Sequence, residues 1–362
     1  MVARTKFLNA RSGLAVLAVL ALALTACSGS PASSPDDSTD PATAEAAEVT
    51  EVSVRTDVYF SGAVLPLVAG VELGIYEDHG LEITINPGTG SATTIQTVGN
   101  GSDDIGYADA AALVQSVAKG IPVKMVYGMV QQSPLALFAF DDSGITTPTD
   151  LEGKTAGYTA GSAAEVLFPA FAKAVGIDEE AVTFRNVDIP TRTNLFMAEK
   201  TDFTFGLLNV SEPNIEILCD CSIVSFPYYD AGVQTLSSGI IAGDSFIKDN
   251  PDVLKRFLAA TQEAVEFANE NTDEAVDAFF KVATDSTAKK SVIAAQWKAS
   301  WELRETALNE GQPFGCTAAS DWESTIDLME QYAEMKPDSV VPGAVADNSF
   351  NPGSCSEPLG DS

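Results

Sequence analysis

Short β-rich segments alternate with amphipathic helical segments along most of this chain. The first β-rich runs lie at residues 52–59, 81–86, 104–107 and 123–129, and helical periodicity separates them at residues 63–76, from residue 91, and at residues 108–119. Repeated strand–helix–strand units form a parallel sheet that is covered by helices on both faces. The order therefore predicts an α/β fold built on parallel-rich sheets.

The alternation begins again at residue 135 and predicts a second sheet. A strand at residues 135–140 leads out of the first sheet, further strands are expected at residues 154–158, 182–187, 203–207 and 222–226, and residues 234–241 would carry the chain back to the first lobe. We therefore expect two lobes joined by a two-strand hinge, with lobe one at residues 49–139, lobe two at 140–236, and lobe one completed by 237–362. A ligand would bind in the crevice between the lobes, near the carboxyl ends of the strands.

The last third of the chain is predominantly helical. Helical periodicity covers residues 251–271, 273–282, 291–308 and 319–332, and none of these segments has catalytic spacing. We expect these C-terminal helices to pack on lobe one. In lobe two, Ser162-Ala-Ala-Glu165 predicts a capping box, in which Ser162 caps the helix and Glu165 reaches back.

The N-terminus has the features of an export signal. Basic residues precede an apolar run at 14–24, which is shorter than the roughly 20 residues of a membrane-spanning helix. The run ends in Leu-Thr-Ala-Cys, a lipobox, so we expect residues 1–26 to be cleaved and Cys27 to carry lipid. Residues 27–48 are rich in Ser, Pro, Thr, Ala and Asp and predict a disordered tether. These features predict anchoring on the extracytoplasmic face of the cell membrane. The alternative is a secreted protein that discards Cys27.

Charge and histidine content narrow the function. The formal net charge is −31, and three of the 20 basic residues lie in the leader, which leaves 17 basic and 51 acidic residues in the mature chain. Nucleic acid is therefore excluded as a partner. His79 is the single histidine of the sequence, which argues against zinc sites built from several histidines. We expect a monomer with no metal site and no cofactor.

Four cysteines follow Cys27 in the sequence. An exported protein lies where disulfides persist, and four cysteines allow three pairings. We expect Cys316 to pair with Cys355 and fasten the C-terminal tail, which leaves Cys219 to pair with Cys221. Metal binding by Cys219 and Cys221 is the alternative, but no other ligand cluster accompanies them.

Four motifs resemble the solute-binding proteins of ABC importers. They are Pro-Gly-Thr-Gly-Ser-Ala-Thr-Thr at 87–94, Gly-Tyr-Ala-Asp-Ala-Ala-Ala at 106–112, Asp-Leu-Glu-Gly-Lys at 150–154 and Ala-Gly-Ser-Ala-Ala-Glu at 160–165. The branch they resemble binds nitrate, sulfonates, taurine and thiamine-pyrimidine precursors, and the resemblance runs from about residue 50 to residue 345. It implies a periplasmic-binding-protein-like fold of type II, a small-molecule ligand, and an ABC permease with its ATPase as partners. It implies a binding protein and not an enzyme.

Polar and aromatic residues at the expected strand ends define a candidate pocket. Aromatic rings stack on flat heterocycles, and carboxylates accept hydrogen bonds from exocyclic amines. The candidate ligand-binding residues are Asp57, Tyr59, Phe60, Gly90, Ser91, Tyr107, Asp109, Ser162, Asn209, Glu212 and Tyr228. The alternative for the aromatic residues is the core, and the alternative for Ser162 is a helix cap. The set predicts a small aromatic heterocycle such as a thiamine pyrimidine precursor.

Two other functions remain as alternatives. A sulfonate, taurine or nitrate binder would use Ser, Thr, backbone N–H groups and Arg, and the three acidic candidates would repel such an anion. The same fold occurs in thiamine-pyrimidine synthases, which the resemblance associates with an active-site histidine, pyridoxal phosphate and a cysteine-rich segment. Here His79 lies outside the expected pocket, and the sequence has no run of adjacent cysteines.

Overall fold

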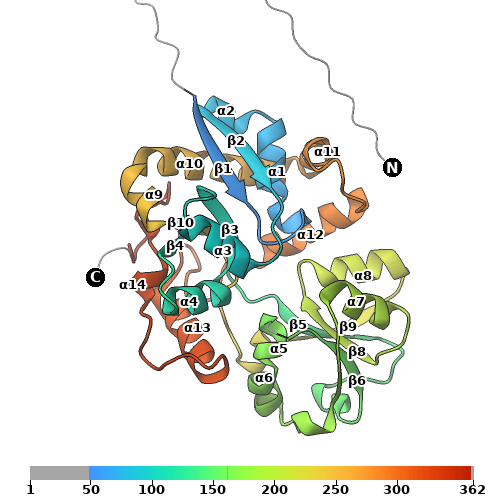
Figure 1. Ribbon diagram of the computed structural model, residues 1–362. Coiled ribbons are helices and arrows are strands. Elements are labelled where there is room, and N and C mark those ends of the chain that lie inside the picture. Colours follow the sequence, from blue (N-terminus) through green and yellow to red (C-terminus); the bar gives the residue numbers. More distant parts are fainter. Residues whose placement is uncertain (1–48, 161, 360–362) are drawn as a thin grey trace, which may run out of the picture. The chain divides into compact units, whose positions relative to one another are not determined.

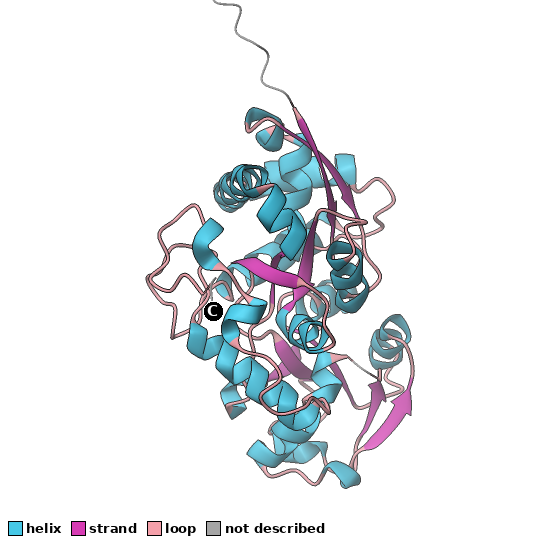
Figure 2. Ribbon diagram, turned by 60° about the vertical axis from the view of Figure 1, so that its left-hand side comes forward, coloured by secondary structure: helices cyan, strands magenta, loops and turns pink. Residues whose placement is uncertain are grey.

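The computed structural model describes residues 49–160 and 162–359. Its strands form two five-stranded sheets (Figures 1 and 2). The predicted signal peptide at 1–26, the lipidation site Cys27 and the tether at 27–48 lie outside the described residues. Within the described ranges, no helix is both long enough and apolar enough to cross a membrane.

The first sheet has the strand order β2-β1-β3-β10-β4. Its strands are β1 (Thr50–Arg55), β2 (Leu81–Asn86), β3 (Ile105–Asp109), β4 (Val123–Gly128) and β10 (Ser238–Gly243). Strand β1 pairs in parallel with β2 and β3, whereas β10 lies antiparallel between β3 and β4. The returning segment expected at residues 234–241 therefore enters the middle of this sheet.

The second sheet repeats this plan with the order β7-β6-β8-β5-β9. Its strands are β5 (Leu135–Phe140), β6 (Thr155–Tyr158), β7 (Thr183–Asn186), β8 (Phe203–Leu207) and β9 (Ile223–Pro227). Strand β6 pairs in parallel with β7 and β8, and β5 lies antiparallel between β8 and β9.

The α/β fold class with parallel-rich sheets is confirmed: in each sheet four strands run in one direction and a single strand runs antiparallel to them. The antiparallel strand in each case is one that arrives from the other sheet. Strands joined by a crossover helix are held parallel, whereas β5 follows β4 through a short crossing and is free to run the other way. Hydrophobic periodicity carries no information about this direction.

Helices cover the sheets in the positions that the sequence pattern indicates. They are α1 (Leu65–Glu72), α2 (Ile75–Asp78), α3 (Ser91–Gly99), α4 (Ala110–Ala118), α5 (Ala163–Val166), α6 (Phe168–Val175), α7 (Ile189–Met197), α8 (Ser211–Cys219), α9 (Asp244–Asp249), α10 (Pro251–Glu270), α11 (Thr272–Val282), α12 (Lys290–Glu302), α13 (Ala319–Tyr332) and α14 (Pro342–Val345). The helix predicted at residues 291–308 is α12, which ends at Glu302.

The C-terminal helices pack on the first sheet and its helices, as expected. Helices α10 and α11 pack against α1, and α13 packs against α4. Tyr76 stacks on Phe257 of α10 with ring centroids 5.3 Å apart, and both rings are buried. Helix α12 departs from this role because it also contacts α8 beside the second sheet (Figure 1).

Two disulfides form, and both are the expected pairs. Cys316 is bonded to Cys355 across 39 residues, which fastens the C-terminal tail to the segment before α13. Cys219 is bonded to Cys221 at the end of α8. Because these thiols are consumed in bonds, the alternative of metal binding by Cys219 and Cys221 is wrong for this structure.

Candidate ligand-binding site

The loop after β1 is fixed against the turn that follows β2. Gly88 N donates a hydrogen bond to Val58 O at 3.0 Å, and Gly90 N donates to Asp57 O at 2.6 Å. A side chain at Gly88 would place its Cβ 2.0 Å from Thr56 O, so only glycine allows this approach. The loop that carries Asp57 is therefore held rigidly at the carboxyl end of β1.

Asp57 and Asp109, which we call the acidic pair, are half-buried carboxyl groups at the ends of neighbouring strands. Burial, with a smaller effect from the charge of Asp109, raises the pKa of Asp57 to about 7. The hydrogen bond that its Oδ1 accepts from Val58 N acts in the opposite direction. Burial raises the pKa of Asp109 to about 6, against the effect of the backbone N–H groups of Ala111 and Ala112 that its Oδ1 accepts. Two poorly hydrated carboxyl groups at strand ends are suited to a partner that donates hydrogen bonds or carries positive charge.

Three further predicted residues lie around the acidic pair. Tyr107 on β3 is buried, and burial together with the charge of Asp57 raises the pKa of its phenol. Ser91 begins α3, and its Oγ accepts a hydrogen bond from Asp109 N at 3.1 Å. Gly90 precedes α3 with φ 143°, and a Cβ there would meet no atom within 4 Å. The fold therefore brings five predicted residues to the carboxyl ends of β1 and β3.

Tyr59 and Phe60 border a groove of about 610 Å³. Tyr59 is 62% exposed, yet its phenol pKa is raised by the surrounding protein and by Asp57, which indicates a side chain standing in an open cleft. Phe60 packs edge-on against Phe279 at 6.4 Å and is partly buried. The other lining residues are Ser61, Ile85, Pro87, Asn214, Leu218, Val282, Ala283, Thr284, Asp285, Ser286, Thr287, Ala288, Lys289, Val292, Ile293 and Gln296.

Helix α12 and the loop before it line the groove, and the sequence did not predict this. These residues come from a segment that periodicity marks only as a packing helix. A run of small and polar residues at 283–288 between two helices is the signal that could have indicated a surface loop.

Ser162 differs from its predicted role. Its hydroxyl donates to the buried carboxylate of Glu165, which also accepts from Thr159 N at 3.1 Å and forms an ion pair with Arg192. Ser162 makes no side-chain cap, so the predicted capping box is wrong. Glu165 instead turns toward Arg192 because burying the carboxylate requires a cation beside it.

Asn209 joins the second sheet to α12. It is 3% exposed, and its Nδ2 donates to Ser300 Oγ at 3.0 Å, while its Oδ1 has no partner among the described residues. Nearby, Gln296 accepts from Gly62 N at 2.8 Å and donates to Val210 O at 2.9 Å. Gln296 and Ser300, which the sequence analysis missed, therefore link the two halves of the fold beside the groove.

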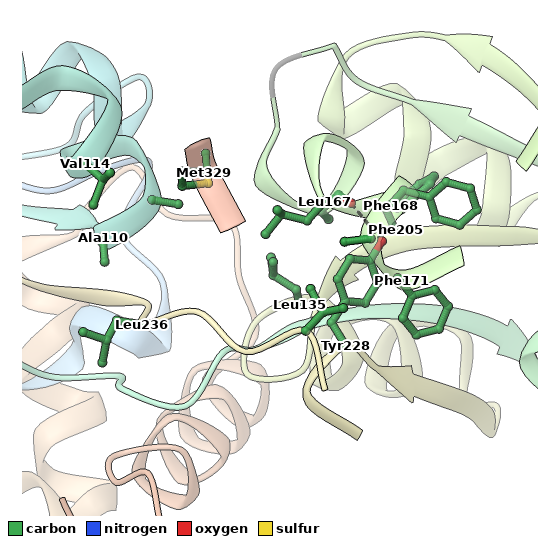
Figure 3. Close-up of a cluster of buried hydrophobic side chains, with 14 of the residues drawn as sticks. Ala110, Val114, Leu135, Leu167, Phe168, Phe171, Phe205, Tyr228, Leu236 and Met329 are labelled. Carbon is green, nitrogen blue, oxygen red and sulfur yellow. Dashed lines mark hydrogen bonds between the residues drawn. The ribbon is translucent and has the colours of Figure 1, made fainter. Parts of the chain in front are cut away.

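The structure places Tyr228 in the core and Glu212 to one side of the groove. The ring of Tyr228 is fully buried, stacks on Phe171 at 4.6 Å, and its hydroxyl donates to Ala164 O at 2.8 Å (Figure 3). Tyr228 N also donates to Leu135 O, which turns the side chain toward the second sheet, so we remove Tyr228 from the candidate site. Glu212 accepts from Ser225 Oγ, and burial raises its pKa, but it does not line the groove.

Solved structures with the same fold include periplasmic sulfonate-binding proteins. The aliphatic sulfonate-binding protein SsuA from Escherichia coli matches with a TM-score of 0.63 and 14% identity, covering 86% of this chain and 94% of that one. The sulfonate-binding SsuA from Methylobacillus flagellatus matches with a TM-score of 0.62 and 16% identity, covering 84% and 93%. At these identities the likeness defines the fold class, a periplasmic-binding-protein fold.

The sequence places the chain more narrowly. Residues 62–275 match the family model described as NMT1/THI5 like, and the chain belongs to this family. A formylaminopyrimidine-binding protein from Halalkalibacterium halodurans is 25% identical over 291 residues, covering 80% of this chain and 86% of that protein.

Two further groups of relatives carry different names. A 4-amino-5-hydroxymethyl-2-methylpyrimidine phosphate synthase from Legionella pneumophila is 26% identical over 232 residues, covering 63% of this chain and 72% of that protein. Binding proteins of Brucella abortus and Brucella suis are 24% identical over 212 residues, and the chain spans 63% of their length.

Proposed function

We propose that this protein is the extracytoplasmic solute-binding component of an ABC importer and that it binds a small aromatic heterocycle bearing an amine, such as a thiamine pyrimidine precursor. The acidic pair is the observation that carries the proposal. Its two carboxyl groups lie at the strand ends where ligands of α/β proteins bind, beside Tyr107 and close in sequence to Tyr59. An exocyclic amine would donate to them, and the exposed ring of Tyr59 would stack on the heterocycle. The formylaminopyrimidine-binding relative supports this ligand class.

An anionic ligand, the alternative, fits the charges less well. Arg55, the arginine nearest in sequence to the site, pairs with Asp103 and donates to Pro87 O at 3.2 Å. Arg192 is held by buried Glu165. With these two guanidinium groups engaged, a sulfonate or nitrate would meet the acidic pair without a compensating cation from either of them.

We propose binding without chemical conversion, although one relative is named as a synthase. His79 ends α2, and its Nε2 lies 2.9 Å from Glu263. It is next to Gly80, whose carbonyl accepts from Thr50 N at the amino end of β1. Asp57 follows the opposite end of β1, so the histidine is one strand length away from the acidic pair.

The proposed mechanism is closure of two lobes about a hinge. Each lobe would be built on one sheet, so the predicted boundaries, lobe one at 49–139 and 237–362 and lobe two at 140–236, shift because β5 (Leu135–Phe140) belongs to the second sheet. The two crossings would lie near 129–134 and 228–237. Ligand that contacts both lobes would select the closed state, which the permease and its ATPase then recognise. We further propose that the protein acts as a monomer, anchored to the membrane through lipid on Cys27.

Calorimetry on the mature protein tests the ligand class. We expect 4-amino-5-hydroxymethyl-2-methylpyrimidine to bind and to raise the melting temperature, whereas taurine and nitrate do not. Asp109→Asn should weaken binding more than tenfold, since asparagine keeps the cap on α4 but removes the charge. The control is Asp142→Asn, an exposed turn residue, which should leave binding unchanged. Stabilisation by taurine or nitrate in place of the pyrimidine would overturn the proposal.

A further inference from the structure

The groove beside Tyr59 brings together exposed apolar side chains from both halves of the fold. Tyr59 comes from the loop after β1, and Leu218, which is 45% exposed, comes from α8 of the second half. The other exposed large apolar residues of the described ranges lie outside the groove; they are Val49, Ile189, Leu308 and Val341. Two exposed apolar residues that share one groove indicate a binding surface more strongly than single scattered ones.

The groove has apolar and polar walls, and ten of its eighteen lining residues are apolar. Val292 and Ile293 of α12 and Ile85 of β2 line it together with Phe60. Charged groups in the lining are Asp285 and Lys289, both exposed, and Lys289 Nζ lies 3.4 Å from Ile217 O. An apolar or aromatic group therefore fits this lining better than a charged one.

The groove adjoins the loop that carries Asp57, because Tyr59 and Pro87 line it and Gly90 N donates a hydrogen bond to Asp57 O. Tyr59 follows Asp57 by two residues, and the charge of Asp57 acts on its phenol. Pro87 lines the groove and directly precedes Gly88, which is bonded to the same loop through Val58 O. The groove therefore begins within two residues of Asp57 along the chain.

The size of the groove exceeds what one small ring needs. Its volume of about 610 Å³ lies in the range of roughly 300–1,000 Å³ that is typical for whole drug-sized ligands. The groove is separate from the acidic pair, because neither Asp57 nor Asp109 lines it. A single pyrimidine ring at the acidic pair would leave this apolar volume filled with water.

We propose that the ligand has two parts: an amine-bearing ring at the acidic pair and an apolar extension that lies along the groove from Tyr59 to Leu218. The inference rests on the proposed function and narrows its ligand class from a single ring to an extended heterocycle. The extension is an aromatic or alkyl group, and it gains affinity by leaving water for the walls formed by α8 and α12.

The test compares two ligands on the mature protein by calorimetry. One is 4-amino-5-hydroxymethyl-2-methylpyrimidine, and the other carries a benzyl group on its hydroxymethyl oxygen. Burial of the added ring should tighten binding by about tenfold to a hundredfold. Leu218→Ser should reduce this preference to near one, and Ala288→Trp, which fills the groove, should do the same if the first variant folds poorly.

Leu308→Ser is the matched control, because Leu308 is 61% exposed and does not line the groove. It should keep the full preference for the benzyl compound. Equal affinity of the two ligands for the unmodified protein, or a preference that persists in both groove variants, would overturn the two-part ligand while leaving the proposed function standing. If neither pyrimidine binds, the proposed function and this inference both fail.

Discussion

Removal of the Cys316–Cys355 disulfide should destabilise the protein by an amount set by the closed loop. The bond joins residues 39 apart in the sequence. Its loss raises the conformational entropy of the unfolded chain and lowers the free energy of unfolding by about 4 kcal/mol at 25 °C. For a folded part of about 310 residues, an unfolding entropy of about 2.1 cal/mol/K per residue converts this into a fall in melting temperature of about 6 °C. We expect this shift for the double variant Cys316→Ser, Cys355→Ser in a thermal melt followed by circular dichroism.

The second disulfide supplies the matched control. Cys219 and Cys221 are two positions apart in the sequence. The same treatment therefore gives a loss of unfolding free energy of about 1 kcal/mol and a fall in melting temperature of about 2 °C. Reduction of the unmodified protein should reproduce the sum of the two shifts. If Cys219→Ser, Cys221→Ser lowers the melting temperature as much as Cys316→Ser, Cys355→Ser does, loop length is not what determines the stabilisation, and the reasoning fails.

Three further predictions concern the site and the joint beside it. Gly88→Ala should cost at least 2 kcal/mol, roughly, because the new Cβ meets Thr56 O at 2.0 Å, and urea unfolding that matches the unmodified protein would contradict this. The pKa of Asp57 is about 7 in the folded protein and 3.8 for the ordinary, unperturbed carboxyl, so the folded state binds the proton more tightly. Stability should therefore fall as the pH rises from 4 to 8, by up to about 4 kcal/mol. Asp57→Asn should make that pH profile less steep and leave the part that comes from Asp109, whose pKa is raised to about 6; an equally steep profile in the variant would argue against this account. Gln296→Leu leaves Gly62 N and Val210 O unpaired, so we expect the free energy of unfolding measured in denaturant to fall by about 2–4 kcal/mol. Gln331→Leu, at an exposed position of α13, should change it by near zero and is the comparison.

The acidic end of the site was predictable because it follows from a rule about strand ends. Asp109 is the last residue of β3 and Asp57 follows the end of β1 by two residues, and neighbouring parallel strands bring their carboxyl ends to one edge of a sheet. Ser91 and Gly90 join them because α3 starts at the same edge. The disulfides were predictable because four cysteines allow few pairings.

The sequence-based predictions fail at residues whose side-chain position depends on contacts with segments far away in the sequence. Tyr228 lies at a crossing, and the direction of its side chain depends on pairing with Leu135, which local sequence does not reveal. Glu165 follows Ser162 with capping-box spacing, but the buried guanidinium of Arg192, 27 residues on, attracts its carboxylate. Gln296 contacts Gly62 across 234 residues, so no local pattern could have assigned it to the joint.

The place of β10 sets an order of events for the newly made chain. The strands of the second sheet all come from one continuous stretch, whereas β10 arrives late and inserts between β3 and β4. Asp109 lies opposite Ser238 in that ladder, so the strand end that carries it is completed by a partner synthesised more than a hundred residues later. Pairings between such distant segments form slowly. A nascent chain can therefore complete its second sheet before its first, and the carboxyl end of β3 is completed only after Ser238 has emerged.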